Sequence, residues 1–79
     1  MANTEMTLPE IFVQLPEEIQ AALESALERS TLPLDPTKSE IFVATEVVVF
    51  DLKYRFPMAS QRVVELLDMV PQAVANLLS

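Results

Sequence analysis

Residues 37–56 read TKSEIFVATEVVVFDLKYRF, and the structure of this stretch decides the fold class of the 79-residue chain. Read as a helix, it has two apolar stripes. The inner stripe consists of Ile41, Phe42, Val48, Val49, Leu52 and Phe56, and the outer stripe of Val43, Val47, Phe50 and Tyr54. Read as a strand over about 46–56, it alternates, with Phe50, Leu52, Tyr54 and Phe56 on one face and Asp51, Lys53 and Arg55 on the other.

Length favours the helix. The stretch runs for twenty residues without an internal Gly, Pro or Asn, whereas strands usually end after about 4–8 residues. Thr37 and Glu40 have the spacing of a capping box, in which a hydroxyl and a carboxylate each bind an otherwise unpaired backbone amide. No residue pair near 44–46 favours the tight turn of a hairpin. We therefore predict a helix over about 37–56, with an α+β fold containing a strand at about 46–56 as the alternative.

Six prolines divide the rest of the chain. A second capping-box pair, Thr7 and Glu10, predicts a short helix over about 8–14. Pro16 suits the first turn of a helix over about 16–30, whose apolar stripe is Ile19, Ala22, Leu23, Ala26 and Leu27. After a linker at 30–36 and the 37–56 helix, a final helix is expected over about 58–78, with a kink or break at Pro71.

The predicted fold is therefore all-α, a small helical bundle of three main helices plus a short N-terminal helix. All 79 residues are expected to form a single domain.

Composition excludes several kinds of chemistry. The chain has no His, Cys, Trp or Gly, which removes disulfides, thiolate and imidazole catalysis, Cys/His zinc sites and glycine-rich phosphate loops. Its carboxylates fall mainly on predicted solvent faces, where nothing separates their pKa values as acid–base catalysis requires. We predict that the protein is not an enzyme and has no catalytic residues, cofactor or metal site.

Acidic residues are concentrated in the first part of the chain. Residues 1–34 hold six of the twelve acids and one of the five bases, and the chain carries a net charge of −7. In the predicted second helix, Glu17, Glu24 and Glu28 share the side opposite the apolar stripe. This acidic ridge is a candidate docking site for a basic partner, although a solvated helix face is the simpler interpretation.

A basic and aromatic cluster is predicted around Tyr54 and Phe56, flanked by Lys53, Arg55 and Arg62. Interleaving of this kind can stack bases and bind phosphates. The overall charge of −7 opposes binding to a polyanion, so the rings are better explained as core, with the basic stems covering its edge. For this reason we do not expect a nucleic acid as partner. We do not expect a membrane either, because the longest purely apolar runs, 41–44 and 47–50, are far shorter than the ~20 residues of a membrane span.

The apolar content points to a protein partner. Hydrophobic residues make up 51% of a chain so short that folding buries only about 60% of its surface. A helix that is apolar on two sides must be covered on both. The outer stripe, Val43, Val47, Phe50 and Tyr54, is therefore the candidate interface, with a homodimer as the expected state.

The predicted function is a small acidic protein–protein interaction module that self-associates, acting as an adaptor, assembly factor or inhibitor of an unidentified protein. Two alternatives are an antitoxin-type transcriptional regulator, in which a strand at 46–56 pairs across a dimer, and an acidic mimic of nucleic acid. A cytoplasmic location is expected, since the chain lacks Cys and its first residues show neither the basic region nor the apolar run of a signal peptide.

Overall fold

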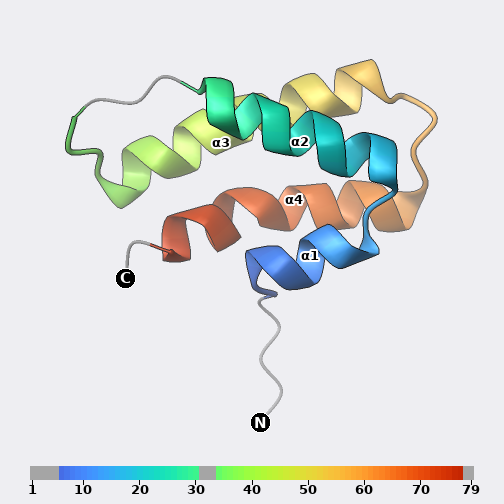
Figure 1. Cartoon of the computed structure of the whole chain (residues 1–79), viewed down its shortest axis with the longest axis horizontal. Coiled ribbons are helices and arrows are strands. Elements are labelled where there is room, and N and C mark those ends of the chain that lie inside the picture. The colour runs from blue at the N-terminus through green and yellow to red at the C-terminus, as the bar shows by residue number, and fades with distance from the viewer. Residues whose placement is uncertain (1–5, 31–33, 78–79) are drawn as a thin grey trace, which may run out of the picture.

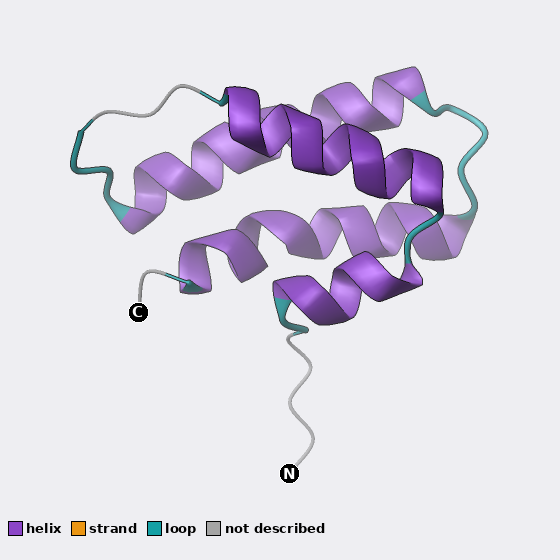
Figure 2. Ribbon diagram, viewed as in Figure 1, coloured by secondary structure: helices purple, strands orange, loops and turns teal. Residues whose placement is uncertain are grey.

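The fold of the described residues is all-α. The structure, a computed structural model, describes residues 6–30 and 34–77. Within these residues there are four helices and no strand: α1 (Leu8–Gln14), α2 (Glu17–Arg29), α3 (Lys38–Arg55) and α4 (Gln61–Asn76) (Figures 1 and 2). The predicted all-α bundle is confirmed. The alternative with a strand at about 46–56 is wrong, because these residues lie within α3 and at its C-terminal cap.

Hydrogen-bonding side chains start three of the helices. Thr7 and Glu10 form a capping box at α1, and Thr37 and Glu40 form one at α3. At α3 the Thr37 hydroxyl accepts the Glu40 amide at 3.1 Å, and the Glu40 carboxylate accepts the Thr37 amide at 2.8 Å. At α4 the Ser60 hydroxyl accepts the Val63 amide at 3.2 Å. These contacts satisfy amides that have no partner inside a helix, which is why the helices begin at these residues.

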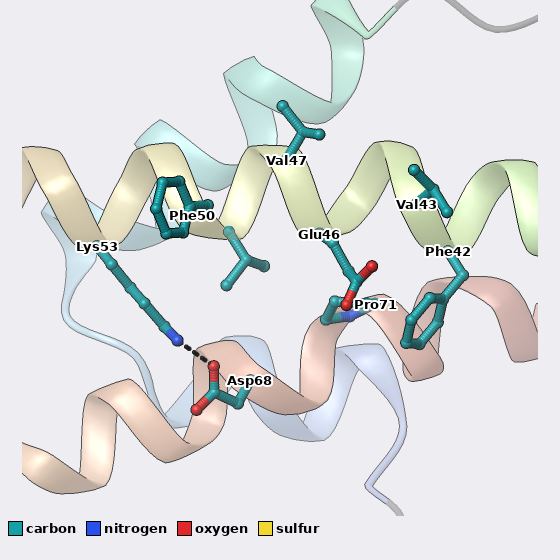
Figure 3. A pocket seen from close by; sticks show the side chains of 9 residues that line it. Phe42, Val43, Glu46, Val47, Phe50, Lys53, Asp68 and Pro71 are labelled. Atoms are coloured by element: carbon teal, nitrogen blue, oxygen red, sulfur yellow. Dashed lines mark ion pairs between the residues drawn. The ribbon is translucent and has the colours of Figure 1, made fainter.

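The four helices form a flat arrangement with principal extents of 35 × 35 × 16 Å. The antiparallel helices α3 and α4 pack along each other, while α2 packs on α3 and α1 on α4 (Figure 1). Figure 3 looks at the α3–α4 pair from the other side, with α1 and α2 behind it. Helices α3 and α4 thus form one layer and α1 and α2 the other. The core lies between these two layers, and its largest fully buried side chains are Ile11, Leu23, Leu52, Leu66, Leu67 and Val70.

Helix α3 places its inner stripe in this core. Ile41, Val49 and Leu52 are buried, and the other members of the inner stripe are half-buried. Thr45 is also buried on this side, and its hydroxyl donates to the Ile41 carbonyl at 2.7 Å, so that this buried polar group is paired. The two-layer arrangement therefore covers α3 on the side of the inner stripe.

Helix α4 continues through Pro71 to Asn76. Pro71 is buried, and it lacks the amide hydrogen that would bond the Leu67 carbonyl. The helix does not end at Pro71, so of the predicted kink or break the structure excludes the break. The predicted end of this helix at residue 78 and part of the 30–36 linker lie outside the described residues.

Candidate interaction surface

The outer stripe of α3 faces solvent. The exposed fractions of its side chains are 57% for Val43, 65% for Val47, 77% for Phe50 and 83% for Tyr54. They lie away from the buried inner stripe, because α2 and α4 pack on the other sides of α3. Single exposed apolar residues are common on protein surfaces, but four in a line on one helix form a patch of the kind that marks an interaction site.

A shallow groove of about 450 Å³ runs beside the outer stripe, between α3 and α4 (Figure 3). Its lining residues are Phe42, Val43, Glu46, Val47, Val49, Phe50, Lys53, Asp68 and Pro71. The α3 residues form one wall, and Asp68 and Pro71 of α4 form the other. The groove widens the apolar surface of the stripe toward α4 and adds charged groups to it.

Asp68 and Pro71 were not among the predicted site residues. Asp68 lies on the polar side of α4, and Pro71 was interpreted only as an interruption of the helix. The sequence contains no signal for their place in the groove, because it depends on how α4 is rotated and positioned against α3.

The charges along the groove are partly paired. The Lys53 ammonium forms an ion pair with the Asp68 carboxylate, which links α3 to α4 (Figure 3). Glu46, one turn beyond Val43, has no ion pair among the described residues. Exposed ion pairs contribute only about 0–1 kcal/mol each, so Lys53 and Asp68 help to orient the two helices rather than to hold them together.

The structure separates the members of the predicted basic and aromatic cluster. The interpretation of both rings as core is wrong for Tyr54, which is 83% exposed on the outer stripe. Phe56 does pack against the core, and the Arg55 guanidinium lies 5.9 Å from its ring centroid. Each basic side chain of the cluster has an acidic neighbour: Asp68 for Lys53, Asp51 for Arg55 at 3.7 Å, and Glu65 for Arg62 at 3.9 Å. These residues therefore do not form a continuous basic surface.

The acidic ridge lies on α2, which belongs to the other layer of the bundle from α3 and its outer stripe (Figures 1 and 3). Glu17, Glu24 and Glu28 are all exposed, while Ile19 and Leu23 on the other side of α2 are buried in the core. The structure thus places the three carboxylates on one solvent-facing side, as the helical periodicity predicts.

Comparison of the chain with protein-family models, with curated proteins and with solved structures gave no match. Its function is therefore inferred from its own surface. In the described residues, no three carboxylates come together in a group that could hold a metal ion. No helix in residues 6–30 and 34–77 is both long enough and apolar enough to cross a bilayer.

One carboxyl group has a displaced pKa. Hydrogen bonds from the backbone amide and the hydroxyl of Thr7 lower the pKa of Glu10, because both donors favour its ionised form. Glu10 is exposed at the start of α1, and its partners are those of the capping box. The displacement therefore belongs to helix capping and does not indicate a reactive site.

Proposed function

We propose that this protein is a small non-catalytic protein–protein interaction module that self-associates through the outer stripe of α3. The observation that supports the proposal most directly is the exposure of Val43, Val47, Phe50 and Tyr54 in a line on a helix whose opposite side is buried. Aromatic side chains at the centre of an apolar patch are the usual anchors of binding energy. Roles as an adaptor, assembly factor or inhibitor all fit such a module, and the absence of Cys supports placing it in the cytoplasm.

The size of the patch suits a dimer. An aromatic side chain covers about 150–250 Å² when it is buried, so two rings at 77% and 83% exposure offer roughly 250–400 Å² per copy. Two copies together would cover about 500–800 Å² with the rings alone, and the valines and the groove add to this. Specific interfaces bury about 1,200–2,000 Å² in total, with about 1,000 Å² as a lower bound. The outer stripe therefore approaches what a reversible dimer needs.

The two alternative functions have less support. The regulator requires a strand at 46–56, and these residues are helical; Lys53 and Arg55, which the strand would present, lie beside acids. The nucleic-acid mimic would act through the acidic ridge on α2, a helix on which no large apolar side chain is exposed as an anchor among the described residues. The outer stripe supports self-association better than either alternative.

The test is the mass of the protein in solution, measured by light scattering after size exclusion at micromolar concentration. The wild type is expected near twice 8.8 kDa. Phe50→Asp should give monomers, because the dimer would bury an unpaired carboxylate. Val13→Asp is the matched control, since Val13 is 78% exposed on α1, away from the outer stripe, and this variant should remain dimeric.

Circular dichroism shows whether Phe50→Asp still folds. Should it lose its helical signal, Val47→Asn provides a milder change on the same stripe, and its dimer should dissociate at a higher concentration than that of the wild type. A wild type that stays monomeric at high concentration would overturn the proposal, as would equal dissociation of the Phe50→Asp and Val13→Asp variants.

A further inference from the structure

The spacing of the outer stripe is that of a coiled-coil seam. Val43, Val47, Phe50 and Tyr54 are separated by four, three and four residues, and alternation of four and three gives the mean repeat of about 3.5 that keeps a seam facing a partner helix. In heptad notation Val43 and Phe50 occupy d positions, and Val47 and Tyr54 occupy a positions. From this seam and the residues beside it, we infer that two copies pair their α3 helices antiparallel, around a two-fold axis between Val47 and Phe50. This inference rests on the proposed self-association.

The charges beside the seam select the direction of pairing. Glu46 and Lys53 occupy g positions on the side of α4, and Ala44 and Asp51 occupy e positions on the other flank of the seam. In a parallel pair a g residue lies next to an e residue of the other helix, and Glu46 would face the partner's Asp51, a like charge, twice per dimer. In an antiparallel pair g lies next to g, so Glu46 faces the partner's Lys53, again twice. Opposite charges meet only in the antiparallel arrangement.

The intrachain contacts leave both groups available for this pairing. Glu46 and Lys53 are seven residues apart, about 10 Å along the helix, so they are too distant to pair within one copy. Lys53 already contacts Asp68, and in the dimer its ammonium would lie between Asp68 and the partner's Glu46. Since Lys53 is partly exposed along the groove, its ammonium can donate to a second carboxylate without losing the contact with Asp68.

Side-chain size along the seam favours the same direction. In the antiparallel register Val47 meets the partner's Phe50 and Val43 meets the partner's Tyr54, so each layer combines one small and one large side chain. In the parallel register Phe50 and Tyr54 would each meet their own copies, while the valines would also meet each other. Layers made only of large or only of small side chains pack poorly, whereas combining the two sizes allows the side chains to interdigitate.

Disulfide cross-linking distinguishes the two directions, because the chain has no native cysteine. Position 43 should lie beside position 54 of the other copy, while two copies of the same position lie about 16 Å apart, beyond the reach of a disulfide. An oxidised equimolar mixture of Val43→Cys and Tyr54→Cys should give a covalent dimer containing both variants. Each variant oxidised alone should give at least about tenfold less.

Charge reversal provides the second measurement. Glu46→Lys should weaken self-association roughly 3- to 30-fold, because it replaces two attractive contacts by repulsive ones at the modest strength of exposed pairs. In a parallel dimer the same change would strengthen binding, since the introduced ammonium group would face the partner's Asp51. Glu28→Lys on α2 is the matched control for the change in net charge. Adding a Lys53→Glu variant to the Glu46→Lys variant should restore association. In the mixed antiparallel dimer, position 46 of each copy faces position 53 of the other, and both of these contacts then join an ammonium to a carboxylate.

The outcomes separate this inference from the proposed function. A dimer that cross-links best between identical positions, and that Glu46→Lys strengthens, would overturn the antiparallel arrangement and leave self-association standing. A dimer that is cross-linked neither in the mixture of the two cysteine variants nor in either variant alone would mean that the outer stripe is not the interface. That result would overturn both the antiparallel arrangement and the proposed function. A wild type that is monomeric by light scattering would likewise overturn both.

Discussion

Phe50 and Leu52 are two residues apart on α3 and have opposite environments. Leu52 is fully buried, whereas Phe50 is 77% exposed. Hydrophobicity does not distinguish them, since either side chain would be stable in a core. The difference arises because two residues advance an α-helix by about 200°, so that one side chain points into the core and the other points away from it.

Alanine substitutions at these positions should separate folding from association. Leu52→Ala should lower the free energy of unfolding by about 2–5 kcal/mol, because it leaves a cavity in the core. Phe50→Ala should leave the free energy of unfolding of the monomer within ~0.5 kcal/mol of the wild-type value, as substitutions at exposed positions usually do. The same change should weaken the dimer. Urea unfolding at protein concentrations below the dissociation constant of the dimer measures the free energy of unfolding of the monomer for both variants. A large loss of monomer stability in Phe50→Ala would mean that this ring packs within its own chain.

At the scale of single helices, local chemistry explains where α3 begins and why it is not a strand. The Thr37 and Glu40 capping box starts it, and eighteen residues then follow without a helix breaker. The β-branched run at Val47–Val49 and the alternation after it are typical of a strand, but β propensity is a weak preference that packing overrides. In α3 the buried positions follow the helical repeat of the inner stripe. The capping spacing and the length of the run were the correct signals, and the alternation was misleading.

The capping box of α1 gives a pH dependence. The pKa of Glu10 is lowered from its usual 4.5 by the two Thr7 donors, so its contribution to stability is fully present above the unfolded value. That contribution is lost as the pH falls through the lower folded value, where the carboxylate takes up a proton. The amide chemical shifts of α1 should therefore lose helical character in this range before those of α4, whose capping residue Ser60 carries no carboxylate.

Glu10→Gln tests the cause, because it keeps an acceptor but cannot titrate. This variant should show a weaker α1 at neutral pH and little further loss on acidification, while Glu28→Gln on α2 should behave as the wild type does. Acid loosening of α1 that is unchanged in the Glu10→Gln variant would contradict the role of the capping box.

At the scale of the molecule, the flat two-layer shape separates two surfaces. The acidic ridge on α2 and the outer stripe on α3 are both exposed and lie on helices of different layers, each with its buried side toward the core. Self-association through the stripe would therefore leave both ridges in solvent. The dimer could keep its acidic faces free for solubility, or for a basic partner.

Reversing the ridge should leave the dimer intact. The double variant Glu24→Lys and Glu28→Lys is expected to keep the wild-type mass in light scattering, and each change should alter stability by no more than ~0.5 kcal/mol. If a basic partner docks on the ridge, the same variant should bind it more slowly, and its association rate should depend less on salt. Dissociation of the double variant into monomers would contradict the separation of the two surfaces.

Much of the architecture could be inferred from the chain alone, for reasons that are local. Capping pairs such as Thr7 with Glu10, the prolines, and the 3.6-residue apolar repeat act within a few turns, so the four helices and their approximate bounds follow from neighbouring residues. The outer stripe could also be identified, since its members share one side of a helix whatever surrounds them. Whether anything covered that stripe could not be inferred, because three other helices were available to do so.

Packing between the helices decided the rest. It placed the short α1 on α4 and α2 on the inner side of α3, which left Val43, Val47, Phe50 and Tyr54 in solvent. It also brought Asp68 and Pro71 to the groove and set Lys53 beside a carboxylate fifteen residues away in the chain. These features depend on the rotation and distance between elements, which many side chains set jointly, and no local pattern of residues encodes them.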